Sequence, residues 1–146
     1  MKLKDTGKIP HHRASGAERL AALADFVEDL PTGKLTFARW FGQGRGCAVG
    51  LAAAQEPWFL AQGLKLEREE SLKDCRPSYC GLSDWEAVAA FFGLAVVEAR
   101  QLFDRIGYQG RIRPAPQEVA ARIRAHLART EASVQGTPAQ GETVTA

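Results

Sequence analysis

The residues best suited to do chemistry in this 146-residue chain are three cysteines, at positions 47, 75 and 80. An odd number of thiols does not close into a disulfide framework, so a reducing compartment is expected. Four residues separate Cys75 from Cys80, which is the wide limit of the spacing in zinc sites, and no second Cys or His pair follows. His11 and His12 lie far upstream, and His126 is isolated near the other end. We therefore expect ordinary thiols, no metal site and no cofactor.

Other catalytic patterns are weak as well. Paired carboxylates can act as acid and base, but Glu67, Glu69 and Glu70 are close neighbours in a charged segment, where glutamates are usually solvated. The glycine-rich segment 42–46 could hold a phosphate, yet it lacks the Lys and Ser/Thr of a P-loop and the Rossmann order of glycines. A tight turn explains it better. No triad-like context surrounds a cysteine, so we expect no catalytic residues and no enzyme.

Basic residues gather late in the chain. Between positions 100 and 129 there are seven arginines, against only Asp104 and Glu118. Such an excess could bind nucleic acid or an acidic protein surface, and arginine is also enriched at protein interfaces. A solvated face, with Glu118 and Arg122 paired one helical turn apart, is the alternative. The residues expected to contact a partner are Arg105, Arg111, Arg113, Arg122 and Arg129.

Residues 88–106 have the spacing of a helix-turn-helix. Small Ala89 precedes Gly93 by four positions, and Ala99 and Leu102 fall at the buried points of the second helix. If this pair of helices reads DNA, the residues offered to the bases are Arg100, Gln101 and Arg105. Any helical hairpin closed by a glycine shows the same pattern, so DNA reading stays the alternative.

The elements that must position these residues are mainly helices. Ser15 and Glu18 have the spacing of a capping box, and Leu20, Leu23 and Val27 follow at helical intervals. Ser83 and Glu86 repeat that spacing before a helix that ends at Gly93, and a further helix is expected from there to Gly107. Pro116 begins the last helix, whose apolar face is Val119, Ala120, Ile123 and Leu127.

The middle of the chain is less regular. Residues 47–54 are nearly all small and predict a buried helix that neighbours can approach closely. Leu64 to Glu67 alternates apolar and polar residues, as a half-buried strand does. We therefore expect a mainly α, compact single-domain bundle of about five helices, with a small strand or hairpin between residues 64 and 80.

Length and composition bound the whole chain. It is as long as one ordinary domain, carries a formal net charge of only +2, and has no run of about 20 apolar residues that could span a membrane. Residues 1–16 are expected to form a flexible polar arm, 17–130 a globular helical domain, and 131–146 a disordered tail. A soluble, cytoplasmic protein is expected.

Several motifs follow one another along the chain: Leu23-Ala24-Asp25-Phe26, Trp40, Gly46-Cys47-Ala48-Val49-Gly50, Trp85, Phe91-Phe92-Gly93-Leu94, Leu102-Phe103 and Val119-Ala120-Ala121-Arg122-Ile123-Arg124. Their order resembles that in a group of small uncharacterised proteins of bacteria and their phages. The resemblance covers about residues 20–127 and implies no established activity. Members often carry a second cysteine shortly before the one matching Cys47, and here Gly44 and Arg45 occupy that region.

The sequence thus favours a non-enzymatic accessory protein that binds another macromolecule. A protein partner is expected first, with nucleic acid as the alternative partner of a helix-turn-helix regulator. Small size, a basic C-terminal half, ample aromatic residues and the lack of a catalytic constellation favour a phage-derived factor that modulates or inhibits a host process such as defence.

Overall fold

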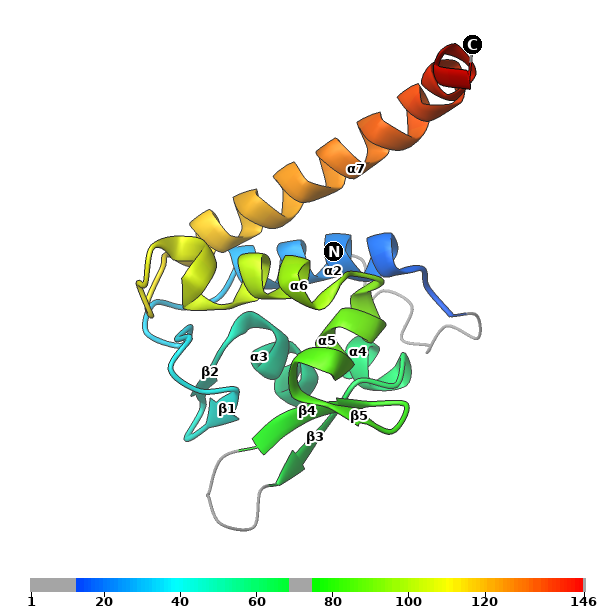
Figure 1. Ribbon diagram of the computed structural model, residues 1–146. Helices are drawn as coiled ribbons and strands as arrows, with labels where there is room; N and C mark the ends of the chain where they lie inside the picture. Colours follow the sequence, from blue (N-terminus) through cyan, green and yellow to red (C-terminus); the bar gives the residue numbers. More distant parts are fainter. Residues whose placement is uncertain (1–12, 69–74, 146) are drawn as a thin grey trace.

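The computed structural model describes the backbone of residues 13–68 and 75–145, and the side chains as far as residue 131. These residues form six α-helices and five short strands. The helices α2, α6 and α7 lie on the side of the molecule opposite the sheet, with α3 and α5 between them (Figure 1). The expected mainly α fold with a small β element is confirmed in this form.

Helix α2 (Gly16–Glu28) begins with the predicted capping box. The Ser15 hydroxyl accepts from the Glu18 amide at 3.0 Å, and the Glu18 carboxylate accepts from the Ser15 amide at 2.7 Å. The preceding residues belong to the body, because Ala14 is buried and its amide donates to Gln62 Oε1 at 2.8 Å. The rest of the predicted polar arm, residues 1–12, lies outside the described residues.

The sheet is larger than the predicted hairpin. Strands β3 (Lys65–Arg68) and β4 (Cys75–Tyr79) pair in an antiparallel register within the expected region. Strand β4 also pairs with β1 (Phe41–Gly42) and with β5 (Leu82–Ser83), and β1 pairs with β2 (Arg45–Gly46). Three of these strands have only two residues each, so they carry no alternating pattern by which the sequence could have revealed them.

Helix α3 (Ala48–Gln55) is buried along almost its whole length, as its small residues predict. A methyl group at Gly50 would lie 1.9 Å from the carbonyl oxygen of Trp40, so only glycine permits this approach. The short helix α4 (Pro57–Ala61) follows directly. Its Phe59 is fully buried and packs edge-on against Phe26 of α2, and so ties α4 to the core.

Helices α5 (Asp84–Phe92) and α6 (Val96–Phe103) are joined by Gly93, which takes the left-handed conformation that its predicted C-cap role requires. The second capping box is wrong: Ser83 precedes α5, but its side chain makes no cap hydrogen bond. Helix α6 also ends earlier than expected. A 3₁₀ turn, η1 (Arg105–Tyr108), follows it and leaves Ile106 exposed.

Helix α7 (Pro116–Thr145) begins at the predicted proline and packs along α2. Val119, Ala120 and Ile123 are buried, and Leu127 packs at the edge of the core, which confirms the predicted face. The backbone of α7 is helical through residues 131–145, for which the composition predicts a disordered tail. In Figure 1 this part of the helix extends beyond the other elements.

Candidate functional site

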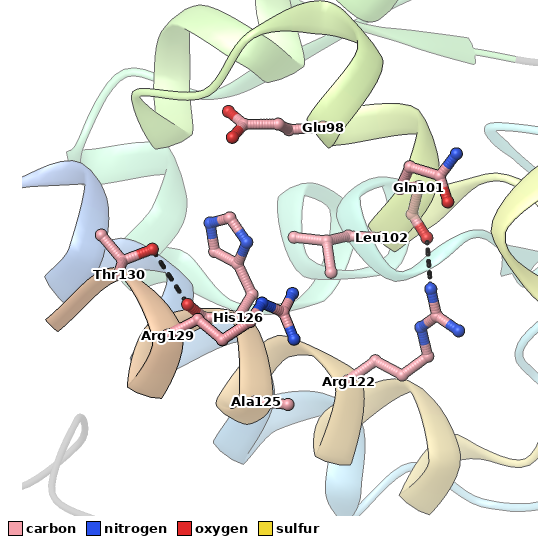
Figure 2. Close-up of a pocket in the computed structure, with 8 residues that line it drawn as sticks. All are labelled: Glu98, Gln101, Leu102, Arg122, Ala125, His126, Arg129 and Thr130. Carbon is pink, nitrogen blue, oxygen red and sulfur yellow. Dashed lines mark hydrogen bonds between the residues drawn. The ribbon is translucent and has the colours of Figure 1, made fainter. Parts of the chain in front are cut away.

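An open groove of about 700 Å³ runs between α6 and α7 (Figure 2). Two helices that diverge from a shared core contact leave such a groove on their outer side. It is lined by Glu98, Gln101, Leu102, Arg122, Ala125, His126, Arg129 and Thr130. Three of the sequence-predicted site residues, Gln101, Arg122 and Arg129, are therefore brought together here.

The α7 wall of the groove is basic. Arg122, His126 and Arg129 follow one another at helical intervals of four and three residues, so their side chains leave the same face of α7. Figure 2 shows the imidazole of His126 pointing from α7 toward α6. The α6 wall carries Glu98 and Gln101, and its charge is opposite to that of α7.

Arg122 is held in place by the core beneath it. Its guanidinium lies 4.6 Å from the centre of the Tyr108 ring, and its Nη2 donates to the backbone oxygen of Gln101 at 3.4 Å. The Tyr108 hydroxyl in turn donates to the Leu102 oxygen at 2.8 Å, and burial raises the pKa of Tyr108 to about 12. The phenol is therefore neutral at physiological pH, and it orients the arginine through its ring face.

Three arginines of the basic segment are engaged in ion pairs instead. Arg111 makes two hydrogen bonds to the carboxylate of Glu118, and this arginine holds the pKa of Glu118 below its usual value. Arg100 pairs with Asp104 at 3.1 Å. Arg124 pairs with Asp25 and Glu28 of α2, at 2.8 Å in each case, and so fastens α7 to α2.

The five predicted partner-contact arginines thus occupy different environments. Arg122 and Arg129 line the groove, whereas Arg111 is bound to Glu118. Arg105 and Arg113 are exposed but do not line the groove. Among the side chains that the structure describes, none forms an ion pair with the guanidinium groups of Arg105, Arg113, Arg122 or Arg129.

The residues predicted for DNA reading are also separated. Arg100 is paired with Asp104 and lies over the Trp85 ring at 5.8 Å, while Gln101 faces the groove and Arg105 belongs to η1. The first turn of α6 exposes Val96 and Val97, the latter at 65%. Glu98 follows, with a carboxylate that accepts from the Ala95 amide at 2.9 Å. Apolar groups and a carboxylate therefore occupy the end of α6 that would approach phosphate.

The cysteines lie apart from this groove. Cys47 is buried immediately before α3, and burial raises the pKa of its thiol to about 11, so it is protonated and unreactive at neutral pH. Cys75 is half-buried in β4, and Cys80 is exposed in the turn after it. Among residues 13–68 and 75–131, no three His, Cys, Asp or Glu side chains gather where they could hold a metal ion.

A second, smaller pocket of about 200 Å³ lies beside Cys47. It is lined by Phe37, Ala38, Arg39, Trp40, Cys47, Trp85, Phe103 and Asp104. The rings of Trp40 and Trp85 pack against each other with centroids 4.7 Å apart, so each ring serves as a packing partner of the other. We assign this pocket no function.

Sequence reasoning did not single out Glu98, His126 or Thr130 as groove residues. The interval from Arg122 through His126 to Arg129 could have revealed the shared face of α7, but it does not show that α6 lies opposite. The sequence reasoning also overlooked Arg19, which is buried against Gln62 and Tyr79. Its position four residues before Leu23 places it on the apolar face of α2.

Comparison of the chain with family models, with curated proteins and with solved structures finds no match. In the part of the chain that the structure describes, no helix is both long enough and apolar enough to cross a lipid bilayer.

Proposed function

We propose that the protein is a non-enzymatic accessory protein that binds another protein through the groove between α6 and α7. The observation that carries this proposal is the distribution of the arginines. Arg100, Arg111 and Arg124 have carboxylate partners within the fold, whereas Arg122 and Arg129 face the groove and pair with none of the described carboxylates. Arginines that lie in a concave surface and form no ion pair with a described carboxylate favour an external partner.

A protein partner accounts for the groove better than duplex DNA does. Val96 and Val97 are exposed in the first turn of α6, next in sequence to the groove residue Glu98, and they are suited to an apolar contact and gain nothing from phosphate. The carboxylate of Glu98 on the α6 wall would repel a phosphate backbone. These features favour a protein surface that offers acidic and apolar groups together.

We extend the proposal to the setting in which this binding occurs. The resemblance to small proteins of bacteria and phages supports a phage origin, and we propose from the small size and the basic groove that this factor acts in the cytoplasm and modulates or inhibits a host process such as defence. Such a factor needs a partner-binding surface and no catalytic centre.

The experiment is a pull-down from host lysate, with and without nuclease, using three forms of the tagged protein. The first is the wild type and the second is Arg129→Glu, which reverses a groove charge that makes no ion pair with a described side chain. The third is the matched control Arg45→Glu, which makes the same charge change at the exposed position of β2. Thermal unfolding of each form checks that the fold is intact.

The proposal expects a discrete protein that survives nuclease, is retained by Arg45→Glu and is lost or strongly reduced with Arg129→Glu. Equal capture by the wild type and both variants would contradict the groove assignment. Recovery of nucleic acid alone, lost on nuclease treatment, would overturn the protein partner in favour of the helix-turn-helix alternative with Arg100, Gln101 and Arg105.

A further inference from the structure

We infer that the groove between α6 and α7 binds an acidic amphipathic helix of the partner, with its carboxylates against α7. This inference rests on the proposed function and adds the chemistry of the partner segment. Its grounds are the charge on the α7 wall, the spacing of that charge, the apolar floor between the charges, and the opposite charge of the α6 wall.

The α7 wall of the groove is positively charged. Arg122 and Arg129 both face the groove, and His126 lies between them along α7. Arg122 is already oriented by the Tyr108 ring and by the Gln101 oxygen, so little side-chain freedom is lost when it meets a carboxylate. A guanidinium binds a carboxylate through paired hydrogen bonds, which makes acidic side chains the complementary groups.

The spacing of the two arginines along α7 matches that of carboxylates on one face of a second helix. Arg122 and Arg129 are seven residues apart on one helix, and this separation corresponds to about 10.5 Å along the helix axis. Two carboxylates seven residues apart on a second helix have the same separation and project from one face. A helix laid into the groove therefore presents both carboxylates to both arginines at once, as helix-in-groove complexes do.

The floor of the groove is lined by apolar side chains. Leu102 and Ala125 line it between the two arginines. Ala125 is exposed and offers a small apolar surface opposite the middle of the bound helix, at the position three or four residues after its first carboxylate, whereas Leu102 is 3% exposed and adds little area. A leucine or a similar side chain at that position completes an acidic–apolar–acidic pattern on a single helical face.

The charge of the α6 wall sets the orientation of the bound helix. Glu98 on the α6 wall would repel a carboxylate, so the acidic face must be turned toward α7. Removing this charge should strengthen binding. Glu98→Gln is the suitable variant, because its amide oxygen can still accept from the Ala95 amide and preserve the cap of α6.

The experiment measures fluorescence anisotropy with the full-length protein and three labelled, alanine-rich helical peptides. The first carries Glu at two positions seven residues apart and Leu at the fourth residue between them. In the second, Lys replaces both Glu residues. In the third, the two Glu residues are five apart and project from different faces. Each peptide is titrated with wild-type protein and with Arg129→Glu, Glu98→Gln and Arg45→Glu.

The inference expects the first peptide to bind most tightly and the lysine peptide not to bind. Arg129→Glu should weaken the complex about ten-fold, and Arg45→Glu should change its affinity less than about two-fold. Glu98→Gln should strengthen binding about two- to three-fold, since one repulsive charge is removed. Affinity should fall as salt rises from about 0.05 to about 0.5 M.

Equal binding of the two acidic peptides, or equal loss with Arg45→Glu and Arg129→Glu, would overturn the inference, because net charge would then explain the result. No binding of any peptide would overturn it as well. The proposed function fails separately: if lysate capture still depends on Arg129 while the peptides do not bind, the protein partner stands and only its acidic helix is wrong.

Discussion

At the scale of single residues, Arg19 differs from every other arginine described. Arg19 is the only buried charged side chain among residues 13–68 and 75–131, and it forms no ion pair with a carboxylate of these residues. Its guanidinium donates to Gln62 Oε1, to the Tyr79 hydroxyl and to the Phe91 oxygen, and lies 4.3 Å from the centre of the Phe91 ring. Neutral acceptors and an aromatic face thus replace a counter-ion, joining α2 to α5, to β4 and to the end of α4.

Truncating this side chain should destabilise the fold strongly. Arg19→Ala leaves the Phe91 oxygen without its side-chain donor, leaves Gln62 Oε1 with the Ala14 amide alone, and opens a cavity, so we expect a loss of about 3 kcal/mol in the free energy of unfolding. Urea unfolding measures this loss, and Arg45→Ala at the exposed position of β2 is the control, with a change under about 0.5 kcal/mol. A loss under about 0.5 kcal/mol for Arg19→Ala would contradict the structural role given to it.

The burial of Cys47 and Tyr108 predicts that the free energy of unfolding falls at alkaline pH. Burial raises the pKa of Cys47 from 9.0 to about 11 and that of Tyr108 from 10.0 to about 12. Above pH 9 the unfolded chain releases protons that the folded chain retains, so ionisation favours the unfolded state. The free energy of unfolding should therefore be fully maintained below pH 9 and fall progressively from pH 9 to about pH 12.

Urea unfolding at a series of pH values measures this dependence, and Cys47→Ala separates the two groups. The variant should lose the part of the decline that begins near pH 9 and keep the part that begins near pH 10, where tyrosine ionises. A wild-type stability that is flat from pH 8 to pH 11 would show that the Cys47 thiol is not buried as described.

At the scale of elements, helix α3 packs closely against the backbone of Trp40. Gly50 has no room for a side chain, since a methyl group would lie 1.9 Å from the Trp40 oxygen. We expect Gly50→Ala to cost about 2 to 3 kcal/mol because the backbone must move apart, despite the better helix propensity of alanine. The control Ala54→Ser, at an exposed position of α3, should cost well under 1 kcal/mol.

Differential scanning calorimetry of both variants provides the measurement. A lower unfolding temperature for Gly50→Ala than for Ala54→Ser confirms the close approach. If Gly50→Ala raises the unfolding temperature, helix propensity outweighs the steric contact, and the packing of α3 on Trp40 is looser than described.

The sequence predicted those elements whose signals are local. The Ser15 cap, the left-handed Gly93 and the start of α7 at Pro116 each follow from a few neighbouring residues, and the structure has all three. The two-residue strands β1, β2 and β5 were missed because pairing with β4 or with one another defines them, and that pairing is not local. The groove was missed for the same reason: α6 and α7 meet only through the tertiary fold.

At the scale of the whole molecule, the distribution of charge matters more than its sum. The net charge is only +2, yet the basic segment has far more arginines than carboxylates. The fold uses part of that excess in ion pairs, among them the pair of Arg124 with Asp25 and Glu28 that joins α7 to α2. It leaves Arg122 and Arg129 facing a groove whose other wall is α6, which exposes Val97 in its first turn, and this combination suits a protein surface.

The most direct test of this account is a ¹H–¹⁵N correlation titration of the ¹⁵N-labelled protein with the acidic helical peptide. Binding in the groove predicts that the largest shift changes fall on the amides of Glu98, Gln101, Ala125 and Arg129, and that Arg129→Glu raises the peptide concentration they require about ten-fold. Shift changes centred on the β1–β2 hairpin or the α3 helix, or none at peptide concentrations that saturate the anisotropy signal, would contradict the groove as the binding surface.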